Sequence, residues 1–576
     1  MYVAKVPNRN SPPAILLRES YRDGKKVKTR TLANLSSWPE EKIEALRAVL
    51  KGEWQAPGHS AFEIERSLGH GHVAATLGTL RATGLEGIVG SKRSRERDLV
   101  VAMVVSRIVD PASKLATVRC LREQTATSTL GEVLGVGQAD EKELYGALDW
   151  LVKRQARIER ALARTHLREG VLVLYDLTST YFEGRSCPLA RFGHSRDGKK
   201  DKLQIVFGLL CTVEGIPVAV KVFEGDRGDP ATLAQEVEKV RGRFGIERIV
   251  FVGDRGLITD ARIRENLRGV GGLDWISALR ASQVRGLVEG GALQLSLFDE
   301  RDLAEIRSPD YPGERLVVCR NPLLAEERAR KREELLAATE TQLDKIVRAT
   351  QRDTRALKGK EKIGMRVGKV LGRFKVGKHF MLTITEESFT YERNTERIGR
   401  EAALDGVYVI RTSVAEPEIL SAEQTVSSYK CLSRVERAFR SLKTVDLSVR
   451  PIYHRLPDRV RAHVFLCMLA YYVEWHMRRA LAPLLFDDDD RAVAQAMRDS
   501  VVAPARRSPN AQRKAHTKRT DEGLPGHSFQ TLLKDLATIV RNRVRFAHGD
   551  TVTEMLTRPT ALQQRAFDLL GIPLKV

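Results

Sequence analysis

Two aspartates stand where the sequence could support metal chemistry, because each of them follows an apolar run. Asp176 ends the stretch VLVLYD that begins at Val171, and Asp254 follows Ile249–Val252 inside a Gly-Asp-Arg-Gly turn. Apolar runs of this kind are typical of strands buried on both faces, where an ionised carboxylate would be costly. We therefore expect the two aspartates to lie at one shared site.

A third acid, Glu436, is expected on a helix that packs against the same sheet. Four apolar residues in YKCLSRVERAFRSLKTVD recur at helical spacing and predict one buried stripe: Val435, Ala438, Phe439 and Leu442. Glu436 lies one position around from that stripe, and Tyr429, Arg440 and Lys443 share the polar stripe beside it. A metal ion and a phosphate would both fit there. The spacing alone also allows a solvated helix with a Glu436–Arg440 ion pair.

The elements that must position these acids divide the chain into six expected regions. A β-hairpin module around the Asp23-Gly24 turn and a helical, possibly DNA-binding region are followed by a core in two parts, with an insertion between them and a C-terminal helical region. The hairpin module is expected at 1–56 and the helical region at 57–169. The core is expected at 170–290 and 401–477, the insertion at 291–400 and the C-terminal region at 478–576. The helical, basic part of the insertion is expected from about Asn321 to Arg400, and the last helix is expected over SFQTLLKDLATIVRNRV.

The charge balance indicates a polyanionic partner. Lys and Arg number 96 against 74 Asp and Glu, which gives a formal net charge of +22. An excess of this size favours nucleic acid. Basic residues also gather between Lys358 and Lys378, which predicts either a surface for the DNA backbone or a solvated helix face.

Other features exclude several classes of protein. The six cysteines form no CxxC pair, which disfavours a zinc module or a disulfide framework. No signal peptide and no apolar run long enough for a membrane helix are present, so a cytoplasmic protein without membrane contact is expected. The acidic run Asp487–Asp490 is interpreted as a solvated linker, and the Gly-His-Gly-His segment at His70 and His72 as a loop.

Three motifs, taken in order, resemble those of bacterial insertion-sequence DDE transposases of the IS-four type, and most of all the IS-sixteen-thirty-four group. They are VLVLYDLTSTYFEG, IVFVGDRG and YKCLSRVERAFRSLK, with GHSRDGKKDKLQIVFGLL and VFEGDRGDPATL between the first two. The third motif of that family reads Tyr, Arg, Glu, Lys. Tyr429, Glu436 and Lys443 match its intervals, and Leu432 stands at the Arg position.

The resemblance implies an α/β fold with a ribonuclease H-like mixed sheet core, a helical and basic insertion, and flanking helical N- and C-terminal regions. It implies that Asp176, Asp254 and Glu436 are catalytic and bind two Mg²⁺ or Mn²⁺ ions. DNA contacts are expected from the residues near these acids, namely Tyr429, Lys443, Arg440 and Arg255. The bacterial, cytoplasmic protein would associate with the nucleoid when bound to DNA.

The function implied by the resemblance is that of a transposase. It would bind the terminal inverted repeats of an insertion sequence, cleave double-stranded DNA and transfer the strands to target DNA, acting as a homodimer that brings two ends together. Two alternatives remain open on the residues: a metal-dependent nuclease with the same core, and a non-catalytic DNA-binding derivative. The intact three acids speak against the derivative, whereas Leu432 leaves room for it.

Overall fold

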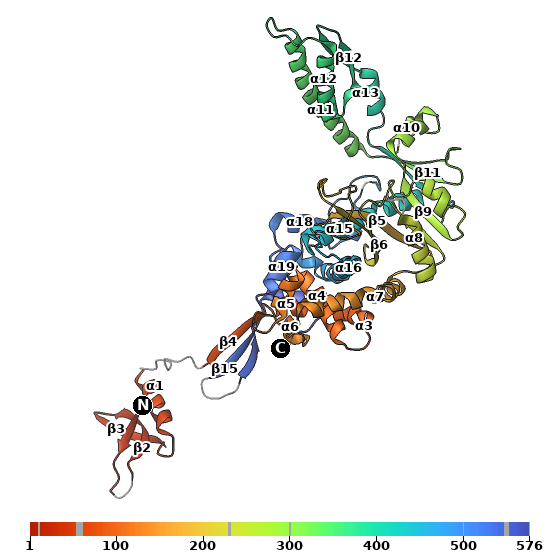
Figure 1. Ribbon diagram of the computed structural model, residues 1–576. Coiled ribbons are helices and arrows are strands. Elements are labelled where there is room, and N and C mark those ends of the chain that lie inside the picture. Colours follow the sequence, from red (N-terminus) through yellow and green to blue (C-terminus); the bar gives the residue numbers. More distant parts are fainter. Residues whose placement is uncertain are drawn as a thin grey trace. The chain divides into compact units, whose positions relative to one another are not determined.

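The computed structural model describes residues 1–9, 12–52, 62–228, 232–298, 301–498, 500–546 and 552–574. The chain forms two compact units (Figure 1). The first contains Met1–Leu68 and Val540–Thr557, and the second contains Gly69–Ile539 and Arg558–Lys575. The expected boundary at residue 56 lies outside the described residues.

The N-terminal segment forms a three-stranded antiparallel sheet followed by a helix. Strand β1 (Tyr2–Val6) pairs with β2 (Ala14–Asp23), and β2 pairs with β3 (Lys26–Asn34). In the turn between β2 and β3, Gly24 has a φ of +63°, which a residue without a Cβ adopts readily. The Asp-Gly pair thus forms the turn of a hairpin, and α1 (Glu40–Lys51) follows the sheet.

A second sheet of the first unit joins segments that are far apart in the sequence. Strand β4 (Phe62–Gly69) lies beside β15 (Val540–Phe546), which pairs with β16 (Val552–Leu556). The prediction of helix for both regions was wrong here, since α19 (Phe529–Leu536) ends before β15. The reason is visible in Val540–Phe546, where apolar and basic side chains mostly alternate with the period of two that suits a strand.

The second unit is built on an eight-stranded mixed sheet with the order β10-β11-β14-β9-β8-β5-β6-β7. Strands β8 and β9 continue parallel to β5, whereas every other pairing in the sheet is antiparallel. The strands are β5 (Val171–Tyr181), β6 (Gln204–Thr212), β7 (Pro217–Glu224), β8 (Ile249–Val252), β9 (Leu273–Ala278), β10 (Leu303–Ile306), β11 (Arg315–Arg320) and β14 (Val407–Thr412). The mixed α/β sheet predicted from the apolar runs is confirmed.

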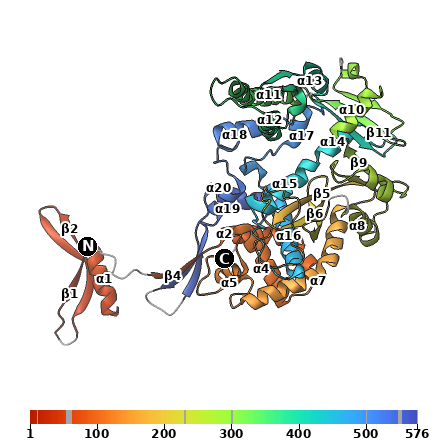
Figure 2. The same cartoon turned by 45° about the horizontal axis from the view of Figure 1, so that its top comes forward.

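Helix α16 (Pro457–Ala480) connects this sheet to the helices that precede it. It contacts β7 as well as α2 (Gly71–Ala82), α4 (Arg95–Val109) and α7 (Glu141–His166). Figure 2 shows α16 beside α4 and α7. Its middle is buried on all sides, which explains why that part of the sequence is almost wholly apolar. One continuous apolar core therefore extends from the N-terminal helices to the sheet.

In the sequence, the insertion lies between β11 and β14, which are neighbouring strands of the central sheet. It contains α11 (Pro322–Thr350), α12 (Lys360–Phe374), the hairpin of β12 (Phe380–Ile384) and β13 (Phe389–Arg393), and α13 (Thr395–Ala402). These elements enclose their own apolar cluster. Strands β10 and β11 fall inside the predicted insertion of 291–400 but belong to the central sheet, because each pairs along its length with a sheet neighbour.

Shorter helices complete the second unit: α3 (Leu85–Val89), α5 (Lys114–Leu121), α6 (Leu130–Val133), α8 (Leu233–Glu238), α9 (Asp260–Arg262), α10 (Ala281–Glu289), α14 (Ala422–Lys430), α15 (Leu432–Arg440), α17 (Arg491–Ala496), α18 (Pro509–Thr517) and α20 (Ala561–Leu570). A π-helical segment, Ser441–Val445, continues α15. In the part of the chain that the structure describes, no helix combines the length and the apolar character needed to cross a bilayer.

Candidate active site

Asp176 and Asp254 extend from neighbouring parallel strands. The register of β5 and β8 pairs Leu174 with Val252, and each aspartate follows its strand's paired residue by two positions. Because side chains alternate between the faces of a strand, Asp176 lies on the same face as Leu174. Leu174 and Val252 both belong to the apolar cluster that includes the helix of Glu436. The two aspartates are therefore brought to one edge of the sheet, beside that helix.

Backbone amides hold both aspartates in place. Leu177 N donates to Oδ1 of Asp176 over 2.8 Å. Oδ1 of Asp254 accepts hydrogen bonds from Gly256 N at 3.0 Å and from Leu257 N at 2.7 Å. One oxygen of each carboxylate is thus fixed by the backbone of its own strand or turn.

The charges of the other two acids act on Asp176. Burial, together with the negative charges of Asp254 and Glu436, raises the pKa of Asp176 to about 7, against the amide of Leu177 and the guanidinium of Arg196. Such an effect on Asp176 requires that the other two carboxylates lie in its neighbourhood. Each of the three comes from a different element, β5, the turn after β8 and α15.

The helix of Glu436 packs as its pattern predicted. The four stripe residues are buried, with exposed fractions of 0% for Val435 and Ala438, 6% for Phe439 and 1% for Leu442. Phe439 meets Phe207 of β6 edge to face, with ring centroids 5.7 Å apart, and α15 contacts β5. Glu436 itself is exposed beside this packed face.

The donor chemistry of the three acids fits hard divalent cations, which prefer carboxylate oxygens. None of the three carboxylates forms an ion pair within the described part of the chain, so their negative charge is left for another cation. Among the described residues, however, no three His, Cys, Asp or Glu side chains already form a group that could hold a metal ion.

Tyr429 lies with these acids, although on a separate helix. Helix α14 ends at Lys430, and Cys431 separates it from α15. Burial raises the pKa of the Tyr429 hydroxyl to about 12, and Asp254 is the nearby charge that contributes most. Leu432, at the family's Arg position, is only 8% exposed and belongs to the apolar core.

Lys443 departs from the predicted polar stripe. It lies in the π-helical segment after α15, where the wider turn carries it off the stripe of Glu436, and it is only 9% exposed. Its Nζ donates to Oδ1 of Asp197 over 3.0 Å, and Oδ2 of Asp197 is 2.5 Å from Arg450. Arg440 remains on the exposed side of α15. The structure thus places Lys443 in an ion pair and separates it from Arg440.

Arg196 is a site residue that the sequence reasoning missed. Its backbone N donates to Oγ of Ser179 over 3.0 Å, and the same hydroxyl donates to the carbonyl of His194. These bonds hold the loop GHSRDGKK against β5. A Cβ at Gly193 would lie 1.9 Å from the carbonyl oxygen of Gly225, so glycine is required where this loop meets the segment VFEGDRG. The quoted motif itself was the available signal.

Arg255 is exposed next to Asp254 and borders a basic cavity of about 430 Å³. The other basic side chains of this cavity come from α10, from α11 and from the turn before β12, namely Arg285, Arg328, Lys331, Arg332, Lys378 and His379. Two acids, Glu401 and Asp405, also border it. The insertion therefore contributes positive charge next to the turn of the second aspartate.

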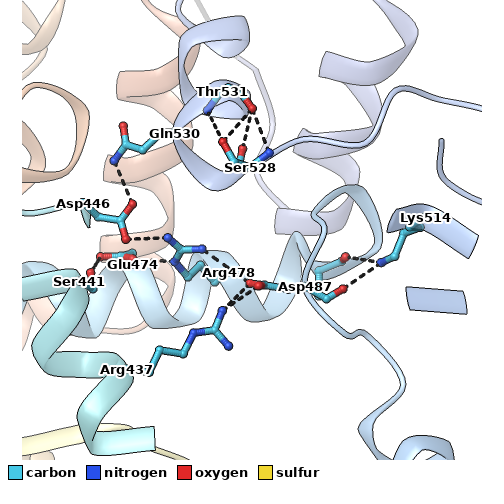
Figure 3. A network of polar contacts seen from close by, with 11 residues as sticks. Arg437, Ser441, Asp446, Glu474, Arg478, Asp487, Lys514, Ser528, Gln530 and Thr531 are labelled. Atoms are coloured by element: carbon cyan, nitrogen blue, oxygen red, sulfur yellow. Dashed lines mark hydrogen bonds and ion pairs between the residues drawn. The ribbon is translucent and has the colours of Figure 1, made fainter. Parts of the chain in front are cut away.

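A buried polar network fixes the helix of Glu436 to α16 (Figure 3). Nη2 of Arg437 donates to both carboxylate oxygens of Asp487 at 2.8 Å. Oγ of Ser441 donates to Glu474 over 2.6 Å. From α16, Arg478 donates to Glu474 over 2.6 Å and to Asp446 over 2.7 Å. Residues on both sides of Lys443 are thus tied to α16, which orients α15.

The acidic run Asp487–Asp490 is used for structure. Asp487 pairs with Arg437, Asp488 accepts from Ser508 over 2.7 Å, and Asp489 pairs with Lys514 at 3.0 Å. Asp490 caps α17. The first three aspartates are half-buried, so the prediction of a solvated linker was wrong for them. Each of the three has its own partner within the protein.

The Gly-His-Gly-His segment forms the start of α2. His70 contacts the hydroxyl of Thr129 at 2.9 Å, and burial lowers the pKa of His72 to about 4. A Cβ at Gly71 would lie 2.3 Å from the carbonyl oxygen of Leu536, so this segment packs closely on α19. Its role is therefore in packing.

Two protein-family models match this chain. Residues 3–59 match the IS1634 family transposase N-terminal domain, and residues 173–473, which include all three acids, match the transposase DDE domain. Among solved structures, the piggyBac transposase synaptic complex with hairpin DNA, determined by cryo-EM, is similar at 10% identity and a TM-score of 0.32, covering 81% of this chain and 76% of that chain. No curated protein sequence matches. The DDE domain match spans more than half of the chain, and the chain therefore belongs to the DDE transposases. Its N-terminal domain is of the IS1634 family.

Proposed function

We propose that this transposase cleaves the terminal inverted repeats of its insertion sequence and joins the ends to target DNA, with Asp176, Asp254 and Glu436 as the catalytic acids. One observation carries the proposal. The charges of Asp254 and Glu436, which come from two other elements, act on the buried Asp176, and none of the three acids has an ion-pair partner among the described residues. Such a set is suited to two Mg²⁺ or Mn²⁺ ions.

When bound, two such ions would activate a water or a 3′-hydroxyl and stabilise the leaving oxygen. The chain's own residues prepare that site. Because the pKa of Asp176 is raised to about 7, its carboxyl is partly protonated near neutral pH. A cation would therefore compete with a proton for this carboxylate. The Tyr429 hydroxyl keeps its proton and can donate a hydrogen bond to a phosphate oxygen. The positive charge of Arg196 acts on Asp176 and lowers its pKa.

We infer further that the core is ribonuclease H-like. Strands β5 to β9 lie in the order third, second, first, fourth, fifth. The first three are antiparallel neighbours, and the last two run parallel to the first. This is the arrangement expected of such a core, and it delivers the first acid from the first strand and the second acid from the fourth.

DNA would reach the acids across basic surfaces. Arg255 and the cavity cations around it lie beside the second acid, and the net charge of +22 favours a polyanion. Arg440 adds an exposed cation on the helix of Glu436. Lys443 would contribute indirectly, because Asp197 already holds it. A homodimer is proposed because two ends must be brought together for joining.

The test is a cleavage assay on labelled DNA that carries the inverted repeats, with Mg²⁺, Mn²⁺ or EDTA. Glu436→Gln should lower the cleavage rate by about a thousandfold, which corresponds to about 4 kcal/mol of transition-state stabilisation, without weakening DNA binding. Glu423→Gln is the matched control, because Glu423 is an exposed acid of the preceding helix. Full activity of Glu436→Gln would remove this residue from the site.

The same assay separates the alternatives. Cuts at the repeat boundary followed by joining to a target duplex support the transposase. Cuts without joining indicate a nuclease with the same core, and binding without metal-dependent cuts indicates a non-catalytic derivative.

A further inference from the structure

A second cavity of about 790 Å³ lies between the helices before the sheet and the start of α16. Its walls come from the end of α4, the start of α5, Tyr145 of α7, the segment Ser448–Leu456 and the first turns of α16. Its Arg, Lys and His side chains are Arg107, Lys114, Arg450, His454, Arg455, Arg459 and His463, and two tyrosines, Tyr145 and Tyr453, also line it. Within the described residues, no Asp or Glu lines it. The cavity is therefore strongly electropositive.

Only part of this charge is compensated. Arg459 pairs with Asp149 at 3.1 Å, and Arg450 pairs with Asp197 at 2.5 Å. The guanidinium of Arg107 donates only to backbone carbonyls, those of Ala112 at 3.1 Å and Ser448 at 3.5 Å. These carbonyls orient Arg107 without cancelling its charge.

Lys114 is the residue of this cavity that points most clearly to an anion site. It is 5% exposed, and it forms no ion pair or side-chain hydrogen bond with the described residues. An ammonium taken out of water without a partner is costly. Burial, and to a lesser degree Arg107, lowers the pKa of Lys114 to about 7. A residue that is merely structural would gain stability by being apolar at this position.

The chemistry of the walls favours a phosphate group. Guanidinium groups present planar sets of N–H donors that match phosphate oxygens, and a nearby lysine adds a point charge. The cavity also connects to the catalytic strand. The guanidinium of Arg450 lies 5.3 Å from the ring centroid of Tyr181, at the end of the strand that carries Asp176. Asp197 links Arg450 to Lys443.

We propose that this cavity, centred on Lys114 and Arg107, binds a backbone phosphate of the DNA whose end is held at the three acids. The assignment rests on the proposed function for its choice of DNA over a free phosphate. It adds a contact from the helical region before the sheet, which is far from the acids in sequence. A phosphate there would fix the position of the strand relative to the scissile bond.

The first experiment measures binding of inverted-repeat DNA to the full chain by fluorescence anisotropy. Lys114→Met should weaken binding about tenfold, as expected for the loss of one charge-assisted phosphate contact. Lys153→Met is the matched control, because Lys153 is an exposed lysine of α7, and it should bind like the wild type. Thermal melting of each variant confirms folding, and Lys114→Met should melt no lower than the wild type.

A methylphosphonate scan makes the test position-specific. Neutralising single phosphates along the repeat should weaken wild-type binding at one or two positions, and Lys114→Met should be insensitive at those same positions. Equal sensitivity of both proteins at every position would overturn the proposal. If Lys114→Met does not fold, Lys114→Gln and Arg107→Lys are scanned in its place.

A third arm distinguishes the source of the phosphate. If inorganic phosphate or ATP raises the melting temperature of the wild type but not of Lys114→Met, while both bind DNA equally, the cavity takes a free phosphate and the DNA assignment is overturned. Failure of the proposed function looks different. In that case the wild type itself does not cleave the repeats, whatever the state of Lys114.

Discussion

The two ends of α16 lie beside buried basic residues that have opposite kinds of partner. Near its C-terminal end, Arg478 is enclosed by Glu474, Asp446 and Asp487. Near its N-terminal end, the helix borders the cavity of Lys114 and Arg107, neither of which has a carboxylate partner among the described residues. Both regions exclude much of the solvent, so the difference does not follow from exposure.

The difference separates structural charge from functional charge. A buried cation with matched carboxylates is balanced within the protein and orients the elements that carry it. A buried cation without an acid is balanced only by a ligand. The acids of the candidate active site are the opposite case, since none of them forms an ion pair within the described residues. Unpaired charges of opposite sign thus distinguish the proposed metal site from the proposed phosphate site.

The largest expected effect comes from breaking the balanced end. Arg478→Met would leave Glu474 and Asp446 buried without their cation, which should lower the free energy of unfolding by about 3–5 kcal/mol. Urea denaturation measures this. Lys114→Met is the comparison and should not lower stability. If Arg478→Met costs less than about 1 kcal/mol, the network does not hold α15 in place.

A carboxylate placed in the unbalanced end should convert it into a balanced one. His454 borders the cavity, and the charge of Lys114 acts on it. His454→Glu should pair with Lys114 and repel phosphate, and it should weaken DNA binding about tenfold or more. His454→Gln is the control, because it changes the shape without adding charge. Unchanged DNA binding by His454→Glu would contradict a phosphate in this cavity.

The titration of Lys114 sharpens the comparison through pH. Below about pH 7 the ligand-free lysine is already protonated, whereas at higher pH it must take up a proton to meet a phosphate. The binding advantage of the wild type over Lys114→Met should therefore shrink as pH rises from 6 to 9, from about tenfold at pH 6 toward none at pH 9. Fluorescence anisotropy at each pH measures the ratio, and a ratio that grows with pH would contradict this origin.

The other groups that face Lys114 should not titrate in this window. His454 has a pKa lowered to about 4, and that of His463 is lowered well below its usual value, both mainly by burial. Burial also raises the pKa of the Cys467 thiol and of the Tyr145 hydroxyl. Arg107 and Arg459 stay charged. The pH dependence thus isolates Lys114.

The smallest expected effect is on the salt dependence of binding. Each phosphate contact releases condensed counterions from DNA, so losing one contact should reduce the slope of log K against log salt by about one. Lys114→Met should show this reduction. Arg478→Met, where it remains folded, should keep the wild-type slope, because its charge is already balanced by acids.

The sequence predicted the candidate acids from local patterns. Apolar runs that end in aspartate imply buried strands, and adjacent parallel strands bring their ends together. The buried stripe of Val435, Ala438 and Phe439 likewise placed Glu436 at the rim of the core. Predictions failed where a local pattern competed with partners far along the chain. Residues 540–546, after Leu536, form a strand because β16 pairs with them. Strand β11 belongs to the central sheet because β14 pairs with it.

Lys443 and Lys114 show in two ways that the partners of a lysine could not be predicted from the sequence. The motif spacing marked Lys443 as a DNA contact, but a π-helical turn moved it into an ion pair with Asp197. No motif marked Lys114, because the neighbours that make it unusual lie on other elements. Arg107, for example, contacts the backbone of Ser448, 341 positions away in the sequence.

The sequence by itself determined the family and the mixed α/β sheet, and it predicted the three acids, because periodicity and motif order are local properties. That β5 continues past Asp176 to Tyr181 was not predicted. Tertiary structure alone decided which charges are balanced. Charge balance depends on distance and on exclusion of water, and both arise only when α4, α5 and α16 pack together. The same packing that pairs Arg478 with acids leaves Lys114 without an acid among the described residues, and this difference distinguishes a structural network from the proposed phosphate site.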